Sequence, residues 1–382
     1  MNVLIVCTAF LPNVEYGGPV TAAMDHAREL QKRGHHVTVI SSNVLAFRPP
    51  AWIAETTNVV DGVTVRYFPS SYVVPHFSLV RSPDLVTWLH ANVRNFDAVH
   101  IHFAREWIPT LAARCALHAE VPVFLQPHGM LNRRSLIKRA VDQMVLQNIL
   151  RSAAAVLVLQ DHERQVIQTI APGTRTVELG NGITLHPDMP QWHRIYPPVV
   201  LFLSRLHPRK RVLDFIEMAS LLHVKHPELT FRVVGPDGGD LQVARAKAAA
   251  LGLSACLYFE GPVNHSAALQ EMARASVYVL PSVDEPFPIS VLEALAVGVP
   301  TVVTTSLHIK DLLERHSAAE IVDPGPMNLA EAVTRLLAHP AEAQQRSTAG
   351  QRLVAERLSL TNVVDRLEEL YASHECRSTI AN

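Results

Sequence analysis

The chain has 382 residues, of which 48% are hydrophobic and 18% charged, and its formal net charge is −1 at pH 7. This composition is typical of a folded protein and excludes extended disorder. The length favours two domains, because one core rarely serves so many residues. The near-neutral charge gives no reason to expect nucleic acid as a partner.

The cysteines and the first residues indicate in which cellular compartment the protein is expected. Cys7, Cys115, Cys256 and Cys376 are far apart and form no CxxC pair, which favours a reducing environment over a disulfide scaffold. The opening MNVLIVCTAF has no cationic lead-in and no later cleavage pattern, and no stretch is apolar enough to span a bilayer. We therefore expect a cytoplasmic protein.

Short β-branched runs alternate with longer amphipathic stretches from the first residue. In the first half, strands are predicted at 2–6, 36–42, 63–68, 98–102, 122–126, 155–160 and 175–179, and helices before Gly34 and at 105–119, 135–151 and 161–170. Near-continuous apolar strands joined by helices imply a parallel sheet covered on both faces.

The alternation stops at LHPDMPQWHRIYPP, where four prolines exclude a helix or a central strand, and we place the domain boundary there. A second α/β series follows. Its strands are predicted at 198–204, 231–235, 256–261, 276–282 and 300–305, and its helices from about 210, in 240–252, in 264–274 and in 285–296. The tail from about 341 is helical, with one apolar face formed by Leu358, Val363, Val364, Leu367, Leu370 and Tyr371.

In open α/β sheets ligands bind beyond the carboxyl ends of the strands, and two first-half loops there carry unusual residues. Gly17 and Gly18 allow close backbone approach to a ligand, although they are equally ordinary turn residues. His128 follows the strand 122–126, and it is either structural or functional. No pair of histidines has a metal-ligand spacing such as HExxH, so we predict no metal site.

The loop SRLHPRKRV puts Arg205, Arg209, Lys210 and Arg211 at the start of a helix, where the macrodipole disfavours cations. A bound phosphate would compensate their charge; the alternative is a solvated basic turn. The next loop, VVGPDGGD, is glycine-rich and begins with Gly235 at the end of a buried strand.

The most informative segment is EPFPISVLEALAVGVP, in which Pro288 suits the first turn of a helix and Gly298 its end. Glu285 lies before this helix, where an acidic residue is commonplace. Glu293 lies inside it among apolar neighbours and needs a hydrogen-bonding partner. A single bound sugar nucleotide would account for the charged residues of these loops together, because cations suit its diphosphate and carboxylates suit its sugar hydroxyls.

Over essentially its whole length the sequence resembles the retaining glycosyltransferases of family 4. The resemblance rests on YGGPV, PHGML, NGI, SRLHPRKRV, VVGPDGGD, EGPV and above all the Glu-x7-Glu element from Glu285 to Glu293. It implies the GT-B fold, with two Rossmann-like, doubly wound parallel-sheet domains facing a cleft. These would be an acceptor-side domain at 1–185, joined by a C-terminal helix of about 360–382 that crosses back to it, and a donor domain at 196–358.

The family's activity implies transfer of a hexosyl-type group from a nucleotide-diphosphate sugar, most plainly a UDP- or GDP-sugar, to a sugar, lipid-linked or small-molecule acceptor in polysaccharide or glycoconjugate biosynthesis. Glu285 would contact the hexose, Glu293 the ribose, and Arg205 with Lys210 the leaving diphosphate. The other implied site residues are His128 near the transferred sugar and Gly17, Gly18, Gly235, Phe287, Ile289 and Ser290 at the donor. The sequence lacks a DxD pair, so we predict catalysis without a metal or a permanently bound cofactor.

Two residues depart from the family pattern. Pro288 stands where glycine often donates a backbone N–H to the ligand, so Phe287, Ile289 or Ser290 must compensate. Arg211 stands where glycine commonly follows the lysine. Both departures put the shape of the phosphate pocket in question.

The sequence also leaves other functions open. GT-B proteins include nucleotide-sugar epimerases and hydrolases, and a homologue could bind the donor without turnover. A two-domain solute receptor is a further alternative, against which the paired glutamates count.

The segment NRRSLIKRAVDQMVLQNILR raises the question of membrane contact. It clusters four cations near the start of a helix and gives that helix an apolar face, so it could dock on anionic lipid at the inner face of the membrane. The alternative is a core-facing helix with a solvated end. The cations are Arg133, Arg134, Lys138 and Arg139, and the apolar face is Ile137, Val141, Val145 and Ile149.

Overall fold

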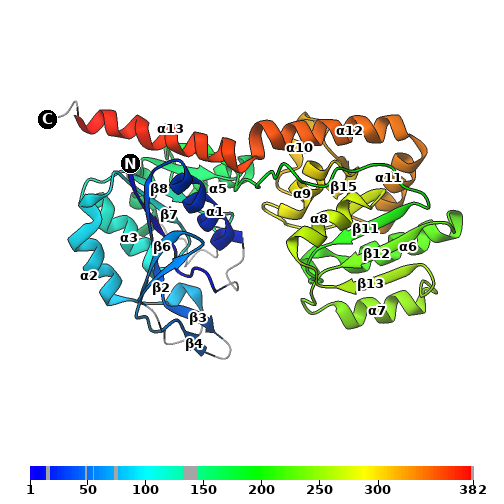
Figure 1. Ribbon diagram of the computed structural model, residues 1–382, viewed down its shortest axis with the longest axis horizontal. Helices are drawn as coiled ribbons and strands as arrows, with labels where there is room; N and C mark the ends of the chain where they lie inside the picture. The colour runs from blue at the N-terminus through cyan, green and yellow to red at the C-terminus, as the bar shows by residue number, and fades with distance from the viewer. Residues whose placement is uncertain (14–17, 48–49, 55, 73–75, 132–144, 380–382) are drawn as a thin grey trace. The chain divides into compact units, whose positions relative to one another are not determined.

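A computed structural model describes the chain except residues 14–17, 48–49, 55, 73–75, 132–144 and 380–382. The chain divides into two compact units. Unit 1 comprises Met1–Gly182 and Leu360–Asn382, and unit 2 comprises Ile183–Ser359. Each unit contains its own sheet of mainly parallel strands, which confirms the predicted α/β fold (Figure 1).

The sheet of unit 1 has the order β10-β9-β8-β7-β1-β2-β6-β5, and all its neighbours pair in parallel except β5 with β6. Its strands are β1 (Asn2–Val6), β2 (His36–Ser42), β5 (Thr57–Val60), β6 (Val63–Phe68), β7 (Ala98–His102), β8 (Val123–Gln126), β9 (Ala155–Val158) and β10 (Thr176–Glu178). A separate hairpin pairs β3 (Val44–Phe47) with β4 (Pro50–Trp52).

Helices cover both faces of this sheet, as the apolar strands predict. Alternate residues of β1 show this, because Leu4 and Val6 belong to one core cluster and Val3 and Ile5 to the other. The helices of unit 1 include α1 (Gly18–Lys32), α2 (Pro83–Asn92), α3 (Trp107–His118), α5 (Asp161–Ile170) and α13 (Leu360–Thr379), with short 3-10 turns at Phe77–Leu79 and Val93–Asn95. The described residues 145–152 are also helical.

Unit 2 has a six-stranded, fully parallel sheet in the order β13-β12-β11-β14-β15-β16. Its strands are β11 (Val199–Leu203), β12 (Thr230–Val234), β13 (Leu257–Gly261), β14 (Val277–Leu280), β15 (Thr301–Thr304) and β16 (Glu320–Val322). Its helices are α6 (Val212–Lys225), α7 (Leu241–Ala250), α8 (His265–Ala273), α9 (Ile289–Val297), α10 (Lys310–Arg315), α11 (Pro326–Ala338) and α12 (Pro340–Leu353), with a 3-10 turn at Pro208–Lys210 and a π turn at Val354–Leu358.

Helix α13 returns the chain to unit 1, as the resemblance predicts (Figure 1). Its inner face joins the core cluster that contains β1 and α1. Arg33, directly after α1, pairs with Glu368 of α13 at 2.6 Å. The residues of α13 up to His374 that are buried are Leu360, Val363, Val364, Leu367, Leu370 and Tyr371.

The two chain crossings between the units lie side by side. The Ile183 N–H donates to the Leu358 carbonyl at 2.9 Å. A Cβ on Gly182, whose φ is +76°, would lie 3.0 Å from the Leu360 Cα, so glycine suits this close passage. The proline-rich stretch after this crossing belongs to unit 2, where the Trp192 indole N–H donates to the Ala275 carbonyl at 2.7 Å.

Three further expectations concern membranes and cysteines. Among the described helices, none is long and apolar enough to cross a bilayer. The cations Arg133, Arg134, Lys138 and Arg139 lie outside the described residues, so the lipid contact stays a prediction. Cys7, Cys115 and Cys256 are buried and free, in agreement with the expected absence of a disulfide scaffold for these three.

Candidate functional site

An ion pair joins two strand-to-helix loops of unit 2. Strands β11 and β14 are neighbours in register, so the loops that leave their carboxyl ends meet. The Val283 N–H donates to the Arg209 carbonyl at 2.9 Å and ties the loops together. The Lys210 Nζ lies 2.7 Å from the Glu285 Oε2, and the two side chains are only 18% and 12% exposed. A cation and a carboxylate are thereby fixed at the edge where ligands bind in such sheets.

Arg205 is a second cation at this edge. Its side chain is exposed and makes no salt bridge with any other described residue. The aliphatic stem lies against Gly238, where a Cβ would come 2.8 Å from the Arg205 Cγ. Gly235 has a φ of +144°, and a Cβ there would overlap the Ser204 carbonyl oxygen. The glycine-rich loop therefore packs on the end of β11, and contact of Gly235 with a donor stays a prediction.

The N-terminus of α9 adds backbone donors. Pro288 precedes the helix as its N-cap instead of lying in the first turn, because its carbonyl already accepts from the Val291 N–H at 3.0 Å. The Ile289 and Ser290 N–H groups have no acceptor among the described residues, and both residues are partly exposed. Free N–H groups at a helix start favour anions. Phe287 is buried beside them.

Two side-chain partners in this region were not predicted. The Ser290 hydroxyl accepts from the buried Tyr278 hydroxyl of β14 at 2.9 Å. The Glu293 Oε1 lies 3.3 Å from the Nε2 of His265 on α8, which supplies the partner that the apolar run requires. Burial raises the pKa of Glu293 to about 7. Glu293 is therefore close to its midpoint of ionisation at neutral pH.

Arg211 has a local role. Its φ of +57° is the left-handed conformation that glycine adopts without strain, which gives a reason for glycine at this position in the family pattern. Its guanidinium binds both carboxylate oxygens of Asp214, at 2.9 and 3.0 Å. The charge of Arg211 is thus compensated within α6.

In unit 1, His128 follows β8 and is buried. Its Nε2 lies 2.7 Å from the Nδ1 of His102, and its Nδ1 lies 3.0 Å from the Asn181 Oδ1. Burial, and then the neighbouring His26, lowers the pKa of His128 to about 3, so its ring is neutral at physiological pH. Both nitrogens of His128 are therefore held by neighbours.

The backbone after His128 is held by a buried carboxylate that sequence reasoning missed. Glu163 accepts from the Gly129 N–H at 2.5 Å and from the Leu159 N–H at 2.7 Å. Burial raises the pKa of Glu163 to about 7. Gly18 is exposed at the first position of α1, and Gly17 lies outside the described residues.

Eight of the predicted donor residues lie in unit 2, where the structure joins Lys210 to Glu285. The unit 2 group is Arg205, Lys210, Gly235, Glu285, Phe287, Ile289, Ser290 and Glu293.

Two family models match the chain. The model of Glycosyltransferase Family 4 matches residues 16–186, and the model of Glycosyl transferases group 1 matches residues 191–353. A GDP-mannose-dependent alpha-mannosyltransferase of Mycolicibacterium smegmatis is 27% identical and aligns over 94% of this chain and 93% of its own. A glycogen synthase of Mycobacterium tuberculosis is 25% identical, over 93% of this chain and 91% of its own.

A solved structure agrees with the fold. Anabaena Alr3699/HepE in complex with UDP superposes with a TM-score of 0.74 at 16% identity, covering 98% of this chain and all of that one (100%). At this identity the likeness establishes the GT-B fold. The two matched models and the full-length relatives together show that the chain belongs to the family 4 glycosyltransferases.

Proposed function

We propose that the chain is a retaining hexosyltransferase that binds a nucleotide-diphosphate sugar on unit 2 and needs no metal for the transfer. The observation that carries the proposal is the Lys210–Glu285 ion pair, together with Arg205, which makes no salt bridge with the described residues, at the carboxyl ends of neighbouring strands. The names of the relatives support a nucleotide-sugar donor, since one is GDP-mannose-dependent and a structural neighbour was solved with UDP. A UDP- or a GDP-sugar is accordingly the proposed donor.

Each group of the donor has a matching feature on unit 2. The diphosphate suits Arg205, Lys210 and the N–H groups of Ile289 and Ser290, which have no acceptor among the described residues, because charge-assisted hydrogen bonds to phosphate are strong. Glu293 suits the ribose hydroxyls and Glu285 those of the hexose. For His128, Gly17 and Gly18 in unit 1, a role beside the transferred sugar or the donor phosphates remains a prediction.

The proposed step forms a bond between the acceptor oxygen and the anomeric carbon while the bond from that carbon to the phosphate oxygen breaks. The acceptor approaches on the face from which the diphosphate departs, so the anomeric configuration is retained. The acceptor proton passes to the departing phosphate oxygen. Two cations and helix-terminal N–H groups stabilise the charge that grows on the diphosphate, which is the task a metal performs elsewhere.

The acceptor is proposed to be a carbohydrate, a lipid-linked sugar or a small molecule, within polysaccharide or glycoconjugate synthesis. A GT-B epimerase or hydrolase would act on the same donor without an acceptor. Product that forms only when an acceptor is supplied, with the anomeric configuration of the donor by NMR, would support a retaining transferase. A rate unchanged by added Mg²⁺ or Mn²⁺ would support catalysis without a metal at the diphosphate.

The donor site is tested by thermal shift across UDP-, GDP- and ADP-sugars and their nucleoside diphosphates. One base class should raise the melting temperature of the native chain. Lys210→Ala should weaken that binding ~10- to 100-fold, since hydrogen bonds to charged groups contribute about 1.5–3 kcal/mol. Arg209→Ala, at an exposed cation of the same loop, is the control and should keep the shift. No stabilisation by any of these ligands would contradict the proposal.

A further inference from the structure

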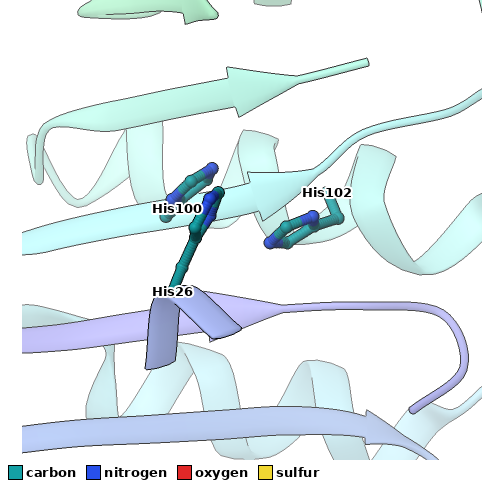
Figure 2. Close-up of side chains that lie close together, drawn as sticks. All are labelled: His26, His100 and His102. Atoms are coloured by element: carbon teal, nitrogen blue, oxygen red, sulfur yellow. The ribbon is translucent and has the colours of Figure 1, made fainter. Parts of the chain in front are cut away.

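Three buried histidines meet in the core of unit 1. His26 comes from α1, and His100 and His102 come from β7. All three are buried, with at most 1% of the residue exposed. One ring nitrogen of each lies within 4.8 Å of the others. Figure 2 shows His26 reaching from its helix toward the two strand histidines, which share a face of the sheet because they alternate along β7.

The hydrogen bonds of His26 fix its tautomer. Its Nε2 lies 3.2 Å from the Asn181 backbone carbonyl, which only accepts, so the proton is on Nε2. The Nδ1 of His26 therefore carries a lone pair. It is buried and has no hydrogen-bond partner among the described residues.

The tautomer of His102 follows from a chain of hydrogen bonds. The Asn181 Oδ1 accepts from the Gln126 side-chain amide at 3.2 Å and from the Nδ1 of His128 at 3.0 Å. The Nε2 of His128 is then an acceptor, so the Nδ1 of His102 donates to it at 2.7 Å. The Nε2 of His102 is left with a bare, buried lone pair, again without a partner in the described part of the chain.

His100 has both ring nitrogens occupied. It lies 3.1 Å from the Gln126 Oε1 through Nε2 and 2.7 Å from the Tyr371 hydroxyl through Nδ1. Because the Gln126 oxygen accepts, the Tyr371 hydroxyl donates to the Nδ1 lone pair. To bind an ion together with His26 and His102, His100 would give up one of these two hydrogen bonds, so that the nitrogen becomes free to bind the ion.

Two buried lone pairs that have no donor among the described residues are costly, and a positive ion is a species that would use both. The outer N–H of His26 binds a backbone carbonyl and that of His102 binds another imidazole, which is how metal-bound histidines are commonly oriented. Burial lowers the pKa of His26 to about 4 and lowers those of His100 and His102, so all three rings stay in the neutral form that binds metals.

We propose that His26, His100 and His102 bind one transition-metal ion of the zinc class, which ties α1 to β7. Imidazole ligands favour zinc, copper, nickel or cobalt over magnesium or calcium. Nitrogens at about 2.0–2.1 Å from a tetrahedral ion lie ~3.3–3.4 Å apart, so the three side chains close slightly around it. A water or hydroxide takes the fourth position, as in other three-histidine sites.

The sequence expectation of no metal site rested on spacing along the chain, which does not reveal this group. The proposed metal lies within unit 1, whereas the proposed donor site is on unit 2, so neither proposal depends on the other.

The proposal is tested with tag-free protein equilibrated with Zn²⁺ and freed of unbound metal. Elemental analysis should find about one zinc per chain, and Co²⁺ in its place should give the visible absorption of a four-coordinate site. His26→Gln and His102→Gln should each weaken the binding by more than the ~10- to 100-fold lost when only an orienting partner is removed. His118→Gln, at an exposed histidine of α3, should bind as the native chain does.

Failure of the native chain to retain zinc, or equal zinc content in all variants, would overturn the proposal. If a glutamine variant fails to fold, a crystal structure of the native chain soaked in Zn²⁺ still decides the question. An anomalous peak at the zinc edge between the three rings is the expected result. A water molecule there, with no such peak, would show that the two lone pairs accept from water instead.

Discussion

Lys210 and Glu285 each compensate the charge of the other. Both side chains are largely shielded from water, so their attraction is screened less than that of a surface pair. Under the proposed function, the cation for the diphosphate and the carboxylate for the hexose are therefore held in one geometry. Removal of either charge leaves the other uncompensated.

This pairing makes Glu285→Gln informative. We expect a nucleoside diphosphate to bind several-fold more tightly, because Lys210 is released and a negative charge beside the phosphates is removed. Transfer should fall by ~10- to 100-fold, because the carboxylate proposed to bind the hexose hydroxyls is lost and hydrogen bonds to charged groups contribute about 1.5–3 kcal/mol. Calorimetry with the nucleoside diphosphate and steady-state rates measure the two effects.

The matched control is Asp284→Asn, which removes the same charge one residue away, where the side chain is exposed and pairs with His308. It should change both quantities little. Weaker binding of the nucleoside diphosphate by Glu285→Gln would contradict this expectation. It would show that holding the Lys210 side chain in place matters more for binding than the repulsion between the Glu285 carboxylate and the phosphates.

Under the proposed function, Glu293 should make donor affinity depend on pH. Ribose hydroxyls donate to the ionised carboxylate, so binding favours the deprotonated form, and the pKa of about 7 places the change in the physiological range. Affinity should rise with pH up to about 7, by up to ~10-fold per unit, and level off above. In Glu293→Gln this component should vanish, and the phosphates' own ionisation, which is common to both proteins, cancels in the comparison.

The raised pKa of Glu293 also makes the free energy of unfolding depend on pH, in the direction opposite to that of donor affinity. Below about 4.5 the carboxyl is protonated in both the folded and the unfolded chain. Between about 4.5 and 7 the folded chain keeps the proton that the unfolded chain loses, so the free energy of unfolding falls as pH rises through this window. Above about pH 7 the carboxyl is ionised in both states, so the stability that its retained proton contributes at lower pH is lost.

At the scale of elements, the sequence predicts those whose signals are local. Strand β7 contains the β-branched residues Val99 and Ile101 and is buried along its whole length, and α9 ends at Gly298 with a φ of +91°, as its sequence indicates. Strand β5 escapes prediction because its residues alternate between half-buried and exposed, and it pairs in the antiparallel sense at the edge of the sheet. The three-residue β16 is too short to carry a periodic signal.

In the candidate site, too, the sequence predicts the residues that have local signals and not the contacts that depend on the folded chain. Lys210 and Glu285 lie in loops whose composition is unusual, so each was predicted from its own neighbourhood. Their pairing, and the partners His265 and Glu163, depend on elements that meet only in the folded chain. The alternation of His100 and His102 on one strand was a visible signal, but nothing local indicates that His26 joins them.

The glycine-rich loop after β12 gives a test at this scale. Gly235 and Gly239 both have positive φ values, but only at Gly235 would a Cβ overlap another backbone atom, the Ser204 carbonyl oxygen. Gly239→Ala should therefore show backbone strain alone, of about 1–3 kcal/mol. Gly235→Ala should lower the free energy of unfolding of unit 2 further, as measured by denaturant titration. Equal losses would show that the loop shifts freely away from β11.

At the scale of the whole molecule, the core of unit 1 is built from two distant parts of the chain. Leu367 of α13 is fully buried in the cluster that contains β1 and α1. Leu367→Ala should destabilise unit 1 by about 2–5 kcal/mol. Amide hydrogen exchange should then accelerate in the strands of unit 1 and not in those of unit 2.

Glu369→Ala, on the exposed side of the same helix, is the control and should leave exchange unchanged in both units. A loss of protection spread evenly over both sheets would mean that the two units unfold as one.

The return of α13 also sets an order of events during synthesis. Ribosomes make residues 183–359 before residues 360–379, so unit 2 has its complete sequence while unit 1 still lacks a helix of its core. Domains usually fold as they emerge, the N-terminal one first. Here unit 1, whose strands are made before unit 2, is completed after unit 2, and the apolar face over β1 and α1 lacks its covering helix until residues up to Tyr371 have been made.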